Sequence, residues 1–104
     1  SDALMKARAK DRWYVPDPNK AQDLEKKREK ALLKEFDTYK AFTGRKIKES
    51  RLEVLRAGFR AAWAAKDYQT IINIANKLPE ETLQEDEKLL TLYDLALTRT
   101  EDGI

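Results

Sequence analysis

The stretch FRAAWAAKDYQTIINIANKLPEE, residues 59–81, decides the fold of this chain. Apolar residues recur at helical spacing on both sides of Lys66-Asp67-Tyr68, whereas the alternation typical of strands is absent. Asp67 can cap a new helix, and Pro79 marks the end of its pattern. The stretch therefore predicts a helix that ends near residue 66, a tight turn, and a second helix over 68–78.

On the C-terminal side, Thr82-Leu83-Gln84-Glu85 has the spacing of a capping box, which predicts a final helix over 83–99. Its apolar residues cover more than half of the helix circumference, too wide an arc for packing on one side. These residues are Leu89, Leu90, Leu92, Tyr93, Leu95, Ala96 and Leu97. We therefore expect Leu92 and Leu95 to contact a partner outside the hairpin.

On the N-terminal side, Ser50-Arg51-Leu52-Glu53 predicts the start of a helix over 51–66 through a second capping box. A stripe of small residues runs beside its large apolar residues, and it would let a neighbouring backbone come close. The stripe consists of Val54, Gly58, Ala61 and Ala65. We expect this helix to lie in the middle of the domain.

A longer helix is predicted over 19–43, with Asp17 or Asn19 as its cap and Pro18 in its first turn. Thr43-Gly44 should end it, because glycine accepts the left-handed conformation that closes helices. Its apolar arc contains Ala21, Leu24, Ala31, Leu32, Phe36, Tyr39 and Phe42. Arg28 and Glu35 also fall within this arc, where they either pair or cover apolar surface with their stems.

The whole pattern predicts an all-α fold, a small helical bundle of four main helices over 19–43, 51–66, 68–78 and 83–99. We expect residues 1–18 to form an N-terminal helix or arm with a proline-rich connection, and residues 19–104 to form a single helical domain. We expect Trp13 and Tyr14 either to cover a helix end, or to contact a partner by stacking on bases or seating a peptide. The first residue is serine, which suggests a cloning remnant or a segment of a longer polypeptide.

Composition argues against an enzyme. The 104 residues include no cysteine and no histidine, which excludes thiol nucleophiles, imidazole catalysis and zinc sites built from these residues. We expect no catalytic, cofactor-binding or metal-binding residues. The acidic group Glu80, Glu81, Glu85, Asp86 and Glu87 suits the N-terminal end of a helix dipole. A hydrolase that uses Glu85 and Glu87 would need both side chains to meet in a cleft.

The chain shows no long apolar run and no leader pattern, so we expect a cytoplasmic protein with no membrane association.

Charge is divided unevenly along the chain. Residues 1–60 hold 17 Lys and Arg against 10 Asp and Glu, and residues 61–104 hold 4 against 9. Either the basic half binds nucleic acid or the two halves attract each other. Candidates for phosphate contacts are Lys26, Lys30, Lys34, Arg45, Lys46 and Arg51. Alternatively, the lysines form a solvated face, with Asp23 paired to Lys27 and Asp37 paired to Lys34.

Residues 58–96, GFRAAWAAKDYQTIINIANKLPEETLQEDEKLLTLYDLA, lie at the centre of a stretch, about 52–97, that resembles the helical hairpin of tetratricopeptide-type repeats. Asp67-Tyr68 matches the turn, Ala62 and Ala75 are the small residues near the crossing, and Pro79 closes the unit. Lys66 stands where glycine is usual, the second helix is about one turn short, and no second copy is present. A lone hairpin must therefore borrow its stacking partners from the flanking helices.

A second resemblance covers RWYVPDPNKAQDLEKKREKALLKEF, residues 12–36, and RLEVLRAGFRAAWAAKDYQTI, residues 51–71. Both are similar to appended helical regions of large bacterial methyltransferase and helicase defence proteins. Together the resemblances imply a docking or scaffolding module of a bacterial DNA-acting protein. Its partner would be the parent chain, another subunit or a second copy. The alternative is a nucleic-acid-binding helical module.

Overall fold

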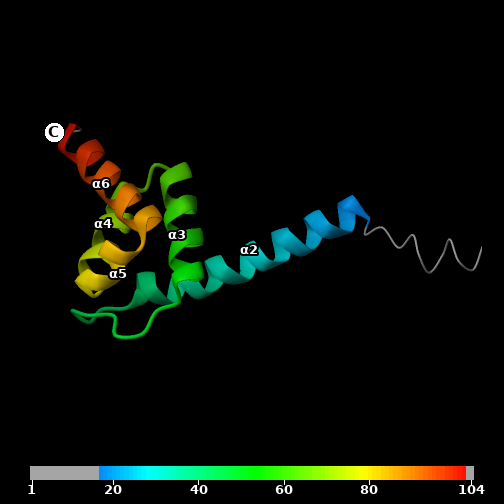
Figure 1. Cartoon of the computed structure of the whole chain (residues 1–104), viewed down its shortest axis with the longest axis horizontal. Coiled ribbons are helices and arrows are strands. Elements are labelled where there is room, and N and C mark those ends of the chain that lie inside the picture. Colours follow the sequence, from blue (N-terminus) through cyan, green and yellow to red (C-terminus); the bar gives the residue numbers. More distant parts are fainter. Residues whose placement is uncertain (1–16, 103–104) are drawn as a thin grey trace, which may run out of the picture.

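The computed structural model describes residues 17–102, which form five helices and contain no strand (Figure 1). The helices are α2 (Pro18–Ala41), α3 (Leu52–Ala64), α4 (Tyr68–Lys77), α5 (Glu80–Glu85) and α6 (Glu87–Asp102). The prediction of an all-α fold is confirmed. The helix or arm predicted for the N-terminus, with Trp13 and Tyr14, lies outside the described residues.

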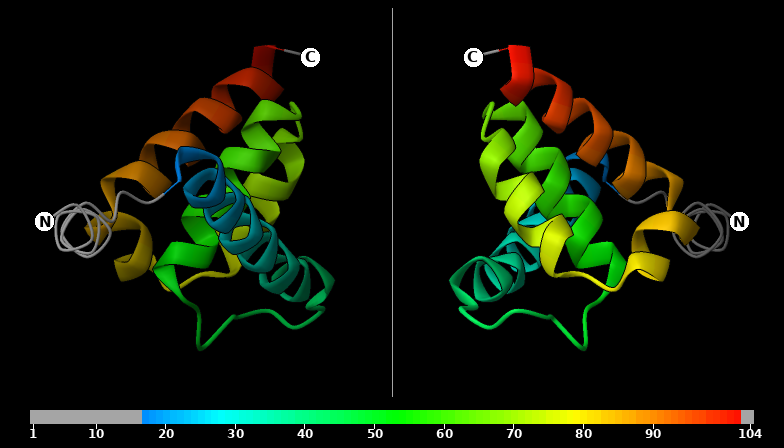
Figure 2. Two further views of the ribbon diagram at one scale, coloured as in Figure 1. Left: turned by 90° about the vertical axis from the view of Figure 1, so that its right-hand side faces the viewer. Right: turned by 90° about the vertical axis from the view of Figure 1, so that its left-hand side faces the viewer.

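Helix α3 is the centre of the fold, as predicted. It packs against α2, α4 and α6, and Figure 2 shows it between α2 and the other helices. Val54, Leu55, Ala57 and Phe59 on α3 are fully buried. Burial of each of the three larger side chains, Val54, Leu55 and Phe59, contributes roughly 1.5–3 kcal/mol, so α3 supplies a central part of the core.

The contact between α2 and α3 depends on the stripe of small residues. The ring of Phe36 on α2 lies against Gly58, and a Cβ atom at position 58 would overlap that ring. Phe36 also meets the ring of Phe59 edge to face, with 6.3 Å between centroids. The close approach predicted at this stripe is thus confirmed, although an aromatic ring, and not a backbone, occupies the space.

The two halves of α2 differ in their surroundings. In the C-terminal half, Leu32 and Phe36 are buried and Leu33 is half-buried. Residues 18–28 are all exposed, and this half of the helix extends away from the body (Figure 1). The predicted apolar arc is therefore only partly right. Leu24 is 58% exposed and Ala31 is exposed, because the position of α3 decides which residues of α2 are covered.

The turn between α3 and α4 closes both helices with backbone and side-chain bonds. Lys66 adopts the left-handed conformation with φ of 59°, and its N–H donates to Trp63 O at 3.0 Å. The N–H of Asp67 donates to Ala62 O at 2.8 Å, completing a Schellman motif. The predicted cap is confirmed, because the Asp67 side chain accepts a hydrogen bond from Thr70 N–H.

Three predicted helices lie within two residues of their predicted ends, but two predicted end signals are wrong. Asp17 caps α2 as expected, whereas Gly44 does not close it. The helix stops at Ala41, and no glycine among the described residues has a positive φ. Helix α3 begins without a side-chain cap, because the carboxylate of Glu53 binds arginines and does not reach back to Ser50.

The final helix predicted over 83–99 is wrong as one continuous element. The segment forms α5 and α6, separated at Asp86. Asp86 Oδ1 accepts a hydrogen bond from Leu89 N–H at 3.1 Å, so Asp86 caps α6. Thr82 lies inside α5 and does not begin the last helix. The helix start therefore falls four residues later than the predicted capping box, and a short extra helix precedes it.

The connection between α2 and α3 is fixed to the C-terminal end of α4. Ile47 in this connection is buried, and its N–H donates to Lys77 O at 2.8 Å. Lys77 Nζ in turn donates to Phe42 O at 2.6 Å. A single isoleucine among basic residues shows no helical periodicity, so the sequence pattern alone does not indicate that Ile47 is a core residue.

Candidate functional site

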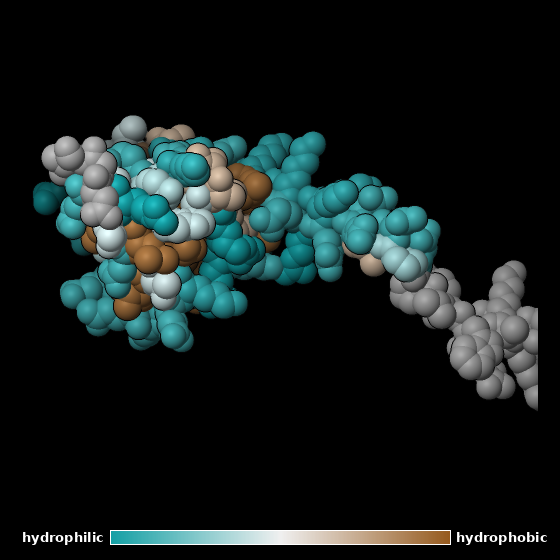
Figure 3. All heavy atoms as spheres, turned by 90° about the horizontal axis from the view of Figure 1, so that it is seen from above, coloured by the Kyte–Doolittle hydropathy of each residue, from teal (hydrophilic) through white to brown (hydrophobic). Residues whose placement is uncertain are grey.

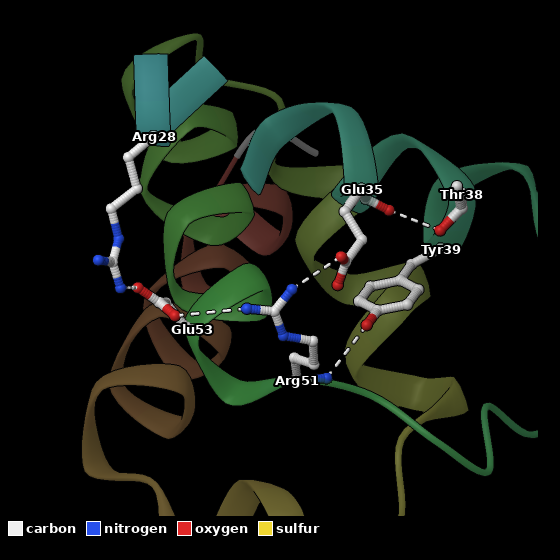
Figure 4. A network of polar contacts seen from close by, with 6 residues as sticks. All are labelled: Arg28, Glu35, Thr38, Tyr39, Arg51 and Glu53. Atoms are coloured by element: carbon white, nitrogen blue, oxygen red, sulfur yellow. Dashed lines mark hydrogen bonds and ion pairs between the residues drawn. The ribbon is translucent and has the colours of Figure 1, made fainter. Parts of the chain in front are cut away.

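Arginine side chains join α2 to the start of α3 (Figure 4). Arg28 pairs with Glu53, while Arg51 lies 2.8 Å from Glu35 and 3.6 Å from Glu53. Arg51 N–H also donates to Tyr39 Oη at 3.0 Å. Arg28 and Glu35 therefore do not pair with each other, since each finds its partner at the start of α3. Hydrogen bonding from Arg28 lowers the pKa of Glu53.

This network engages Arg51, one of the residues predicted to contact phosphate. Both carboxylates near Arg51 come from the same chain, so its charge is already compensated. Arg45 and Lys46 lie exposed in the connection between α2 and α3. Arg51 thus differs from the other predicted phosphate contacts, because its side chain links α2 to the start of α3.

A buried ion pair joins α3 to the start of α6. The Asp86 side chain is only 3% exposed, and its Oδ2 accepts from Arg56 Nε at 2.8 Å and lies 2.6 Å from Arg56 Nη2. Burial raises the pKa of Asp86, but the hydrogen bonds from Arg56 and Leu89 N–H outweigh it and hold the pKa below its usual range. From the sequence, Asp86 was predicted only as one of five acidic residues at a helix start. Its position three residues before Leu89 is the feature of the sequence that could have indicated a helix cap.

An apolar groove lies between α3 and α6. It has a volume of about 440 Å³ and is lined by Arg56, Arg60, Glu87, Lys88, Leu89, Thr91 and Leu92. Leu89 is fully buried and Leu92 is half-buried. Leu95 lies about one turn further along α6 and is 43% exposed. The two predicted partner contacts, Leu92 and Leu95, are thus at the groove and near its end.

The outer face of α2 carries a row of exposed lysines. This lysine row consists of Lys20, Lys26, Lys27, Lys30 and Lys34, and none of them is in an ion pair within residues 17–102. The predicted pairs of Asp23 with Lys27 and of Asp37 with Lys34 are therefore wrong. Asp37 instead lies 3.9 Å from Lys40. Figure 3 shows largely hydrophilic surface along this part of the molecule.

The acidic residues at the junction of α5 and α6 do not converge. Glu80, Glu81, Glu85 and Glu87 are exposed, whereas Asp86 is buried against Arg56. In the described part of the chain, no group of three or more metal-ligating residues is placed to hold an ion. Every buried side-chain nitrogen or oxygen there has a hydrogen-bond partner.

Comparisons with protein-family models, curated proteins and solved structures find no match. Among the helices of residues 17–102, none has the length and apolar character that would let it cross a membrane.

Proposed function

We propose that this chain is a non-enzymatic docking module that binds a partner protein through the groove between α3 and α6. The exposure of Leu95 beside this groove carries the proposal. Helix α6 already packs against α3, α4 and α5, yet its apolar residues extend beyond the side that these helices cover. Exposed apolar surface rimmed by polar residues favours an interaction site, and here half-buried Leu92 and exposed Leu95 continue the apolar line from Leu89 beside charged residues.

The groove has the chemistry to accept an amphipathic helix from another protein or from another part of a larger chain. Leu89 forms its floor, and Leu92 with Leu95 would meet apolar side chains spaced by one helical turn. Arg60 and Lys88 extend the rim with long stems and charged ends. A helix seated here would cover Leu95 and contribute most of its affinity through a few central apolar contacts.

The two sequence resemblances support the same proposal. Tetratricopeptide-type hairpins are packing units that depend on neighbouring helices, and here α2 and α6 lie against the hairpin of α3 and α4. The resemblance to appended regions of bacterial methyltransferase and helicase defence proteins supports a place within a larger DNA-acting protein. In that setting the groove would hold the module against its parent chain or another subunit.

Site-specific photocrosslinking in cells tests the docking surface. A photoreactive residue is placed at Leu92 or at Leu95, and a control is placed at Asn73, which is exposed on α4. We expect a discrete crosslinked species from both α6 positions and none from the control. Equal crosslinking at all three positions, or none at any, would refute the docking surface.

Light scattering over a range of protein concentrations shows whether the partner is a second copy. If so, the apparent mass should rise with concentration for the natural chain and stay monomeric for Leu92→Glu with Leu95→Glu. A constant monomer mass together with a crosslink would assign the groove to a different protein.

A further inference from the structure

We propose that the lysine row of α2 binds the phosphate backbone of nucleic acid without sequence preference. The arginines and lysines of α2 and α3 differ in their ion pairing, and this difference supports the assignment. Arg28, Arg51, Arg56 and Arg60 are each paired with a carboxylate of the same chain. The five lysines of the row have no such partner within the described residues. Their charge is therefore available to an external anion.

The shape of α2 makes the row accessible. Residues 18–28 are exposed on all sides, so a large ligand can approach this half without meeting the body of the protein (Figure 1). Lys26, Lys30 and Lys34 follow one another at four-residue intervals, about 6 Å apart along the helix axis. Phosphates of one duplex strand advance by about 3.4 Å per nucleotide, so the three lysines span about three to four phosphates.

The positively charged lysines of the row also repel one another. Like charges four residues apart destabilise a helix, and Lys26, Lys30 and Lys34 form two such pairs. Asp23 and Asp37 lie on the same face and offset only part of this repulsion. Within the described residues, the ion pair of Arg28 with Glu53 is the tertiary ion pair of the free half of α2, and helices of such length are marginal alone. A bound polyanion would remove the repulsion and stabilise the extended helix.

The composition of the face favours nucleic acid over an acidic protein. Between residues 20 and 34 the lysine face carries no aromatic residue, and Leu24 at its edge is a single exposed leucine rather than an apolar patch that could serve as the centre of a protein interface. Lysine acts on phosphate as a point charge, and contacts to phosphate carry no sequence information. The row lies on α2 and none of its lysines lines the groove of α3 and α6, so its failure would leave the docking proposal intact.

Fluorescence anisotropy with a labelled duplex of mixed sequence, about 30 base pairs long, tests the row. With five phosphates neutralised, log K should fall with log salt at a slope of about −4.5, or about 500-fold between 50 and 200 mM. Lys26→Gln with Lys30→Gln should reduce the slope to about −2.7, or about 40-fold. The control Lys66→Gln with Arg99→Gln removes the same charge from exposed positions elsewhere and should leave the slope unchanged.

Three results would overturn the assignment. They are no binding at about 50 mM salt, the same slope for the α2 variant as for its control, and binding of polyglutamate as tight as that of the duplex. The last would assign the row to an acidic protein. Two duplexes of unrelated sequence should bind equally, since a strong preference for one would require base contacts that the lysines do not provide.

Discussion

Replacing Arg56 by methionine tests the buried ion pair between α3 and α6. The Asp86 side chain is 3% exposed, whereas that of Arg56 is 40% exposed. Loss of Arg56 would therefore leave a carboxylate with almost no access to water. Removal of one partner from a buried pair costs about 3–5 kcal/mol, and we expect about 3 kcal/mol because Arg56 lies at the edge of the core. A domain of this size has a total unfolding free energy of only about 5–15 kcal/mol.

The same substitution should reverse the pH dependence of Asp86. In the natural chain its folded pKa is lowered, so its contribution to stability is complete above the unfolded pKa of about 3.9 and is lost as pH falls below that. Without Arg56, burial dominates and raises the pKa of Asp86. The destabilisation by Arg56→Met should therefore be smaller at pH 5 than at pH 7, because a raised pKa favours protonation of Asp86 as the pH falls.

Urea unfolding followed by circular dichroism at both pH values measures these effects. Adding Asp86→Asn to Arg56→Met should recover part of the lost stability, because asparagine carries no charge and still caps a helix. Additive effects of the two substitutions, or a cost of Arg56→Met that does not change with pH, would refute the account of a buried ion pair.

Three further substitutions test local geometry by urea unfolding. Gly58→Ala should destabilise the protein by about 1–3 kcal/mol despite the better helix propensity of alanine, and less in a Phe36→Leu background. A neutral effect would mean that Phe36 does not fill the space at Gly58. Lys66→Gly should stabilise by about 0.5–1 kcal/mol, because φ is 59° there, and destabilisation would contradict the left-handed turn. Asp67→Ala should destabilise by about 1 kcal/mol, and an unchanged midpoint would contradict the cap of α4.

The features predicted correctly from the sequence are those set by neighbouring residues. Asp17 and Asp67 cap the helices that follow them because their side chains need only reach the next turn. The stripe around Gly58 indicates close packing because small residues recur on one side of a helix. Lys66, noted as a departure from the repeat pattern, takes the conformation that a glycine would adopt at little cost.

The features that could not be predicted depend on where distant segments meet. Glu53 binds Arg28, 25 residues away, which removes the capping box that its spacing suggested. Asp86 binds Arg56, 30 residues away, and divides the last predicted helix. How many residues of α2 stay exposed depends on where α3 packs against this helix. Of the candidate site, the lysines and the two leucines were sequence predictions of contact residues. The ion pairs that engage the arginines and leave the lysines unpaired within residues 17–102 could not be predicted.

Amide hydrogen exchange along α2, measured by NMR without ligand, tests the central claim most directly: one half of this helix packs on α3 while the other stands free. Amides of residues 22–28 should exchange rapidly, whereas those of residues 36–40 should be protected nearly as well as those of α3. Uniform strong protection along the whole helix would contradict this division and the accessibility of the lysine row.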